Sequence, residues 1–131
     1  MSIKYRIVTD GKTHIKKSRN INGDYNLGVF ASVNLKRGEI IEKAPFLEIV
    51  PNGNELAYPL GDYVFESHLN PNNYILVFGH GSMYNHSPDN NVVYYIDDSP
   101  RTMKYIANRN ILAGEELCIN YGSEHSVNKL L

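Results

Sequence analysis

Residues 114–122 read Gly114-Glu115-Glu116-Leu117-Cys118-Ile119-Asn120-Tyr121-Gly122. Gly114 can adopt the positive φ that a tight turn needs, and Leu117 to Tyr121 after it favour a strand. A similar segment, Val33-Asn34-Leu35-Lys36-Arg37-Gly38-Glu39-Ile40-Ile41, also places Gly-Glu in a tight turn before a strand. The two segments therefore predict two similar turn–strand units, and taken alone they indicate turn chemistry only.

Short apolar runs alternate with Gly, Asn and Pro along the rest of the chain. Strands are predicted over residues 3–8, 27–33, 39–41, 46–50, 92–96, 103–107 and 117–121, with a hairpin turn over residues 97–100. Pro45 is expected to separate the strands at 39–41 and 46–50. The only predicted helix is short, around Tyr63 to Leu69, and residues 78–91 are expected to form a loop. Because strands and helices do not alternate as in a Rossmann sheet, the pattern predicts a mainly β domain with long functional loops.

The composition is that of one globular domain. The chain has 131 residues, of which 42% are hydrophobic and 21% charged, with a formal net charge of −1. No segment approaches the roughly 18 apolar residues of a membrane helix, and residues 1–17 contain no apolar block suited to a signal peptide. Cys118 is the only cysteine, and no Cys/His cluster has zinc spacing. A soluble, reducing, intracellular setting is therefore expected.

The charges are unevenly distributed along the chain. In the first 19 residues the only acidic residue is Asp10, and the basic residues are Lys4, Arg6, Lys12, Lys16, Lys17 and Arg19. In residues 39–66 the only basic residue is Lys43, and the acidic residues are Glu39, Glu42, Glu48, Glu55, Asp62 and Glu66. Such clusters can be solvated faces, and an acidic cluster can also steer a basic peptide toward a site. The sequence leaves both interpretations open.

Two further motifs accompany residues 114–122. They are Asn26-Leu27-Gly28-Val29-Phe30-Ala31, and Tyr84-Asn85-His86-Ser87 followed by Asn90-Asn91. Each motif is weak alone, but their order and spacing strongly resemble the SET-domain family over about residues 20–124. The intervening Gly61-Asp62-Tyr63-Val64-Phe65 is similar to the compact SET proteins of large DNA viruses. The resemblance implies one SET domain over residues 1–131, with a β-clip fold of short strands, few short helices and a pseudo-knotted C-terminal segment.

The resemblance also implies an activity, namely methyl transfer from S-adenosylmethionine to a lysine side chain of a protein, with a histone tail as the expected substrate. Such an in-line displacement needs a positioned donor, a neutral amine and a narrow channel that aligns them. The residues that the resemblance assigns are Tyr121 for catalysis, Asn26, Leu27, Gly28, Val29, Asn85, His86 and Tyr121 for the cofactor, and Tyr63 and Ile119 for the lysine channel. No metal is expected.

The individual roles follow the family pattern. The Asn85 amide is expected to hold the amino acid end of S-adenosylmethionine, and the His86 backbone to meet the adenine. Asn26 stands where the family usually has Gly, and Asn tolerates left-handed backbone geometry better than most residues. In the family, the residue at the position of Ile119 faces the lysine amine and tunes how many methyl groups fit. Because Ile119 has no hydrogen-bonding group, the resemblance implies di- or trimethylation. The competing interpretations are core packing for Tyr121, Tyr63 and Ile119, an ordinary turn for Asn85 and His86, and a Gly-containing turn before a strand for Asn26 to Gly28.

Other departures from the family pattern leave alternatives open. Pro88 stands in place of the usual Cys and residues 123–131 contain no cysteine, so no post-SET zinc module is expected. His125 or a second subunit is then expected to close the channel, which favours a homodimer. A catalytically inactive module that binds a peptide or the cofactor, and a methyltransferase for non-histone or small amine substrates, are the alternative functions. No direct nucleic acid or membrane contact is expected, and the location is the host nucleus if the protein is viral and otherwise cytoplasm or nucleus.

Overall fold

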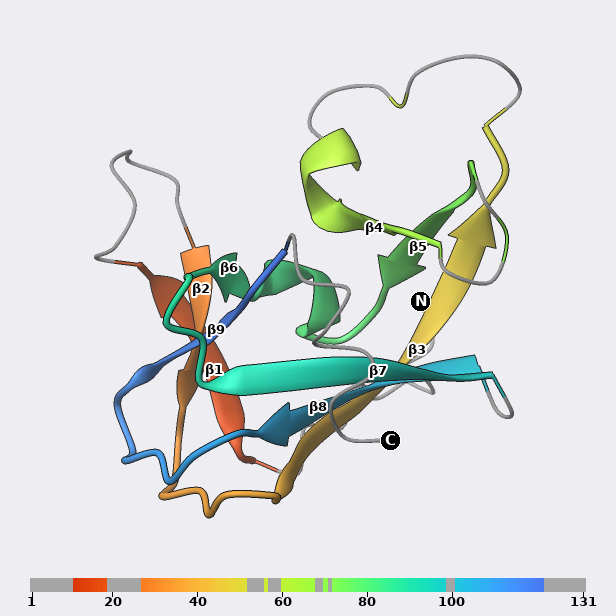
Figure 1. Cartoon of the computed structure of the whole chain (residues 1–131). Coiled ribbons are helices and arrows are strands. Elements are labelled where there is room, and N and C mark those ends of the chain that lie inside the picture. Colours follow the sequence, from red (N-terminus) through yellow and green to blue (C-terminus); the bar gives the residue numbers. More distant parts are fainter. Residues whose placement is uncertain are drawn as a thin grey trace, which may run out of the picture.

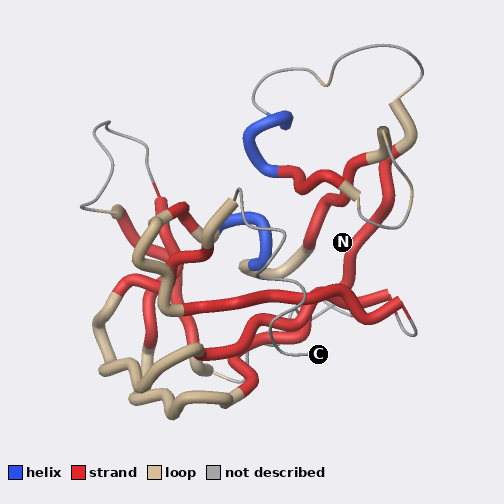
Figure 2. The backbone as a smooth tube through the Cα atoms, viewed as in Figure 1, coloured by secondary structure: helices blue, strands red, loops and turns tan. Residues whose placement is uncertain are grey.

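A computed structural model (Figure 1) describes residues 11–18, 27–51, 56, 60–67, 70, 72–98 and 101–121. Its strands are β1 (Thr13–Lys17), β2 (Leu27–Ala31), β3 (Ile40–Ile49), β4 (Val64–Glu66), β5 (Tyr74–Val77), β6 (Asn85–His86), β7 (Val92–Asp98), β8 (Arg101–Ala107) and β9 (Glu116–Ile119). Two short 3-10 helices, η1 (Leu60–Tyr63) and η2 (Gly81–Met83), complete the described elements. Strands dominate the described chain (Figure 2), which confirms the prediction of a mainly β domain. The strand predicted at residues 3–8 lies outside the described residues.

The strands form two sheets. One has the order β1-β2-β9-β6 and the other the order β4-β5-β3-β8-β7. The last described strand, β9, lies between β2 and β6 and runs parallel to β6, whereas the other pairs are antiparallel. Figure 1 shows β9 returning from the β8 side of the molecule to the sheet that contains β1 and β2. Segments far apart in sequence therefore become neighbours in this sheet.

The predicted hairpin is confirmed, but its strands are longer than expected. Pairing between β7 and β8 extends from Val92 opposite Ala107 to Asp98 opposite Arg101, so Asp97 and Asp98 belong to a strand instead of the turn. The carboxylate of Asp97 lies 3.1 Å from the Nζ atom of Lys104. This ion pair along the ladder helps the strand to continue past the expected turn.

Two predictions about regular structure are wrong. Residues 40–49 form one continuous strand through Pro45, because pairing with β8 ends at Pro45 and pairing with β5 begins at Phe46. The missing N–H of the proline falls where β3 changes partners, so the ladder loses little. Over the described residues 63–67, the helix expected around Tyr63 to Leu69 is instead the end of η1 followed by the strand β4, whose Val64 and Phe65 pair with β5. The predicted loop at residues 78–91 contains η2 and β6.

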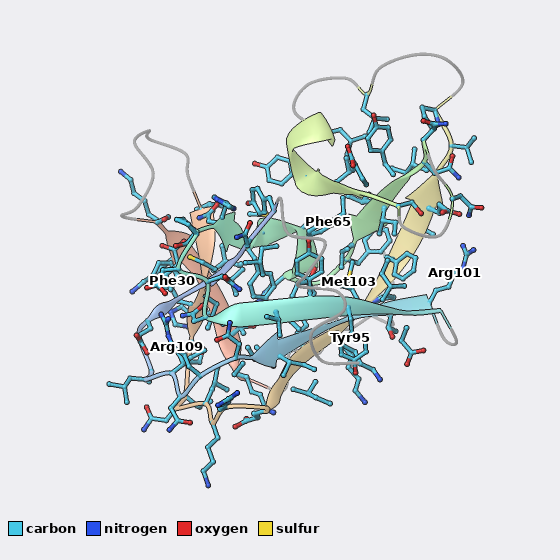
Figure 3. The ribbon with its side chains drawn as sticks, in the orientation of Figure 1. Phe30, Phe65, Tyr95, Arg101, Met103 and Arg109 are labelled. Carbon is cyan, nitrogen blue, oxygen red and sulfur yellow. The ribbon has the colours of Figure 1, made fainter. Side chains whose placement is uncertain are left out.

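The core lies between the sheets. Its fully buried side chains include Val29, Leu35, Ile41, Ile75, Tyr84, Val92, Met103, Tyr105, Ile111, Leu117 and Ile119. Figure 3 shows Phe65 and Met103 in the interior, whereas Arg101 projects outward at the β7–β8 end. Both sheets contribute to this one cluster, which therefore links β2 and β9 to β3 and β8.

The two Gly-Glu segments clasp each other. Gly38 and Gly114 have positive φ values of 87° and 94°, as the turn prediction requires. Leu35 and Ile111 exchange two backbone hydrogen bonds of 2.8 Å. Outside this pair, Asn34 Oδ1 accepts from Ala113 N and Asn110 Oδ1 accepts from Arg37 N, each at 2.9 Å. The similar sequences thus form matched halves of one clasp, which fixes the start of β9 relative to the end of β2.

The described acidic residues of segment 39–66 are partly engaged within the chain. Glu42 is buried, Glu39 lies 3.0 Å from the Lys12 ammonium, and Glu48 accepts hydrogen bonds from Ser67 and Asn70. The segment is therefore not a uniformly solvated face. Its steering of a basic peptide stays a prediction.

Candidate active site

The candidate site lies where β2, β6 and β9 run side by side. On one flank of β9, Leu117 pairs with Val29, and on the other flank Cys118 and Ile119 pair with Asn85 and His86. The three motifs found in the sequence therefore meet in one sheet (Figure 1). Asn26, which is also predicted to bind the cofactor, lies outside the described residues.

Asn85 is held by two acceptors. Its amide nitrogen donates to the Leu27 carbonyl at 3.0 Å and to Glu116 Oε2 at 2.9 Å. The other carboxylate oxygen of Glu116 accepts from the Ser18 hydroxyl at 2.7 Å. Because both N–H donors of the amide are used, Asn85 can offer a ligand only its Oδ1 acceptor. The amide is thus oriented to receive a cationic or neutral donor.

Gly28 packs directly against this amide and carboxylate. A Cβ atom built on Gly28 would lie 2.5 Å from Glu116 Oε2 and 2.9 Å from Asn85 Nδ2. The φ of Gly28 is not positive, so the requirement for glycine is one of space. Its neighbour Val29 is fully buried and its side chain belongs to the core. The Gly28 backbone, Asn85 and Glu116 therefore pack closely together and form a polar corner.

Tyr121 is fixed at both its main chain and its hydroxyl. The hydroxyl donates to the Tyr84 carbonyl at 2.6 Å, and the backbone N–H donates to His86 Nδ1 at 3.0 Å. The rings of His86 and Tyr121 lie 5.2 Å apart. Accepting this bond at Nδ1 places the proton of a neutral His86 on Nε2. Tyr121 is half exposed as a residue, but its hydroxyl group is turned inward onto the backbone.

The Tyr121 hydroxyl stays protonated at neutral pH. Burial of the hydroxyl, together with smaller contributions from the nearby Cys118, Glu116, Tyr63 and Tyr94, raises the pKa of Tyr121 to about 12. The phenol is therefore a hydrogen-bond donor, and its oxygen retains lone pairs that can accept from a second group.

The two predicted channel residues differ in exposure. Tyr63, at the end of η1, is 40% exposed and close enough to Tyr121 to influence its pKa. Ile119 has no exposed surface and packs within the core cluster. The structure therefore brings Tyr63 into the vicinity of Tyr121, and it places Ile119 under the site, opposite His86 in the ladder.

Some residues of the site were not assigned a role from the sequence. Glu116 and Ser18 build the Asn85 corner, and they are 98 positions apart, so no sequence pattern pairs them. The buried Asn91 accepts from Cys118 N at 2.8 Å and donates to the Glu116 carbonyl at 2.9 Å, which extends the support of β9. The Asn-rich end of the second motif was the available signal for Asn91.

Attack by a thiolate at Cys118 is disfavoured. Burial raises the pKa of Cys118 to about 11, so this thiol is protonated and unsuited to nucleophilic attack at neutral pH. Within the ranges given above, no three His, Cys, Asp or Glu residues are grouped so as to hold a metal ion. No helix among these residues is long and apolar enough to cross a membrane.

The family model described as SET domain matches residues 26–122. The crystal structure of a candidate histone methyltransferase from Plasmodium falciparum is 32% identical, with a TM-score of 0.66 over 86% of this chain and 95% of that chain. CpSET8 from Cryptosporidium and the polycomb repressive complex 2 of Chaetomium thermophilum are each 22% identical, with TM-scores of 0.61 and 0.65 over 85% and 86% of this chain. The match covers only 57% and 15% of those two chains, and at this identity it shows the fold alone.

No curated protein sequence matches the chain. Because the similar structures named above come from Plasmodium, Cryptosporidium and Chaetomium, the likeness to compact viral SET proteins stays a prediction. The family match spans the β2, β6 and β9 motifs that build the candidate site, and the chain belongs to the SET domain family, whose members are generally protein lysine methyltransferases.

Proposed function

We propose that this protein transfers a methyl group from S-adenosylmethionine to the side-chain amine of a lysine in a protein, with a histone tail as the preferred substrate class. The observation that carries the proposal is the Tyr121 hydroxyl, fixed on the Tyr84 carbonyl at 2.6 Å beside the corner formed by Gly28 and Asn85. The Plasmodium structure, described as that of a candidate histone methyltransferase, supports the substrate class.

The Gly28 corner has the chemistry to hold S-adenosylmethionine. Because Glu116 and Asn85 fill the space next to Gly28, the Asn85 amide is held in one orientation, which presents its Oδ1 to an ammonium group. The nearby Glu116 carboxylate favours the same positive charge. Asn26 to Val29, Asn85, His86 and Tyr121 are the proposed binding residues. When bound, S-adenosylmethionine supplies a methyl group activated by its sulfonium.

Tyr121 is the proposed catalytic residue. The Tyr121 hydroxyl hydrogen is donated to the Tyr84 carbonyl, and the lone pairs of the hydroxyl oxygen can still act as acceptors. They can accept a hydrogen bond from the lysine nitrogen or contact the polarised methyl group. A pKa of about 12 keeps the hydroxyl in this donor state over the physiological range. The residue therefore orients the reacting groups without exchanging a proton.

The lysine amine must be neutral to attack. Its ordinary pKa is about 10.4, and both an apolar channel and a neighbouring sulfonium lower the fraction that is charged. Tyr63 is proposed to line this channel and Ile119 to limit its inner end. A channel lined in this way needs no metal ion and no general base dyad.

Further parts of the proposal concern organisation and surroundings. We expect residues 1–131 to act as one SET domain without a zinc module, in the cytoplasm or nucleus. A homodimer would supply a second subunit to close the lysine channel. Light scattering at the concentrations used for activity checks this, and a monomer with full activity would contradict it.

The test combines binding with transfer. Calorimetric titration with S-adenosylmethionine in the presence of a chelator is expected to show binding, and incubation with labelled S-adenosylmethionine and mixed histones is expected to label lysines. Binding without transfer to histones or to a protein lysate would indicate the inactive module. No binding at millimolar cofactor would remove the enzymatic proposal.

A further inference from the structure

Residues 80–84 carry one group of the proposed site and directly precede another. The Tyr84 carbonyl accepts the Tyr121 hydroxyl, and the next residue is Asn85, whose amide forms the cofactor corner. This segment 80–84 lies between β5 and β6 and contains η2. Any movement of its C-terminal end would therefore displace the acceptor that orients Tyr121.

One buried carboxylate anchors both ends of segment 80–84. Glu42 Oε2 accepts from the His80 backbone N–H and Oε1 accepts from the Tyr84 hydroxyl, both at 2.8 Å. Glu42 is 3% exposed and Tyr84 is 1% exposed. Since Glu42 belongs to β3, it ties the segment to the central strand of the other sheet.

The middle of the segment is held as well. The Tyr105 hydroxyl donates to the Gly81 carbonyl at 2.7 Å, and the ring of Tyr105 stacks on that of Tyr84 with centroids 4.4 Å apart. The Ser82 hydroxyl accepts from Val77 N at 3.1 Å. A Cβ atom on Gly81 would collide with Val77, so the segment also fits its place closely.

The energetics of the Glu42–Tyr84 pair indicate that its role is to fix the position of segment 80–84. Burial raises the pKa of Glu42 and raises that of Tyr84 well above its usual value, so the Tyr84 phenol remains a donor. Burying a carboxyl group disfavours folding unless its hydrogen bonds are made, and an apolar pair would fill the same space without that demand. What the polar pair adds is one defined position for segment 80–84.

We propose that Glu42 and Tyr84 are positioning residues for the methyl-transfer step. The Glu42 carboxylate holds the Tyr84 side chain in place, and this side chain in turn fixes the position of the Tyr84 backbone carbonyl. That carbonyl orients the Tyr121 hydroxyl. This inference rests on the proposed function, because it assigns the two residues to the action of Tyr121.

The test uses Tyr84→Phe, which removes one oxygen and keeps the ring on Tyr105. We expect kcat to fall about 10- to 100-fold, as misplacement of a reacting group does, with the KM for S-adenosylmethionine changed much less. In a Tyr121→Phe background, Tyr84→Phe is expected to lower the rate of methyl transfer almost no further. The low rates of these variants are measured by label transfer over long incubations. Asn34→Ala, which removes one outer hydrogen bond of the clasp and keeps the Leu35–Ile111 pair, is the control for lost stability and is expected to keep the parental kcat.

A second readout does not depend on turnover. In protein labelled with ¹³C at the tyrosine hydroxyl-bearing carbon, the Tyr121 resonance is expected to shift in Tyr84→Phe and not in Asn34→Ala. Glu42→Gln, which keeps only one oxygen acceptor, is expected to act in the same direction and serves if Tyr84→Phe does not fold. Parental kcat with an unshifted Tyr121 resonance, or equal losses in both backgrounds, would overturn the inference. An inactive parent protein would instead count against the proposed function.

Discussion

Gly28→Ala tests the cofactor corner with the smallest available change. The added methyl group would lie 2.5 Å from Glu116 Oε2, 2.9 Å from Asn85 Nδ2 and 3.1 Å from Glu116 Cδ. These atoms must move apart, and the hydrogen bond between Asn85 and Glu116 must lengthen or break. The backbone itself tolerates alanine, because the φ of Gly28 is not positive. The effect is therefore concentrated on the orientation of the Asn85 amide.

The expected effect on binding is larger than the effect on folding. A hydrogen bond to a charged ligand group contributes about 1.5–3 kcal/mol. At about 1.4 kcal/mol for each factor of ten, losing it raises the Kd for S-adenosylmethionine about 10- to 100-fold. Crowding lowers the free energy of unfolding by about 1–3 kcal/mol. The reduced freedom of the unfolded chain offsets about 0.4–1 kcal/mol of this loss.

Isothermal titration calorimetry and thermal unfolding separate these two effects. Gly38→Ala is the matched control: its φ is 87°, and its added methyl group would meet nothing within 4 Å. Left-handed backbone strain of about 1–2 kcal/mol is expected to lower its Tm while its Kd for S-adenosylmethionine stays parental. A Gly28→Ala protein with parental Kd would refute the assignment of this corner to the cofactor.

Four further predictions address single residues. Tyr121→Phe is expected to lose roughly a hundredfold or more in kcat while its circular dichroism and its Kd for S-adenosylmethionine are kept, and turnover at the parental rate would show that the hydroxyl has no role. Asn85→Ala is expected to weaken cofactor binding about 10-fold or more, and an unchanged Kd with a large fall in Tm would favour a structural role. The parent enzyme is expected to yield di- or trimethyl-lysine in mass spectra after long incubation, because Ile119 offers no hydrogen-bonding group, and exclusive monomethylation contradicts this. Glu39 has its pKa lowered first by the Lys36 backbone N–H and then by Lys12, so its contribution to stability is present above the usual pKa of about 4.5 and is lost as the pH falls through the lower folded value. The difference in unfolding free energy between the parent and Glu39→Gln should accordingly shrink in urea titrations below pH 4.5, and a difference independent of pH would contradict this reasoning.

The local chemistry of turns and strands was readable from the sequence. Gly38 and Gly114 have the positive φ that their turns predicted, and the Val-, Ile- and Tyr-rich runs around residues 97–100 form the predicted hairpin. Pro45 was misinterpreted because a proline breaks a ladder only where its N–H is needed. Its position at a change of strand partners depends on pairings with two distant segments.

The site was only partly predictable for the same physical reason. The motifs contain Gly28, Asn85 and Tyr121, and the structure brings them together through β9. Ser18 and Glu42 belong to no motif, since their roles arise from contacts made only after the sheets have formed. Long-range polar contacts of this kind leave no periodic or local trace in a single sequence.

The role of Tyr121 in methyl transfer is tested most directly by mass spectrometry of histone peptides. The peptides are incubated with saturating S-adenosylmethionine and either the parent protein or Tyr121→Phe. The expected result is methylation confined to lysine side chains with the parent protein, and little or none with the variant at equal occupancy of the cofactor site. Unmodified peptides with a parent protein that binds S-adenosylmethionine, or equal methylation by both proteins, would contradict the proposed role of this site.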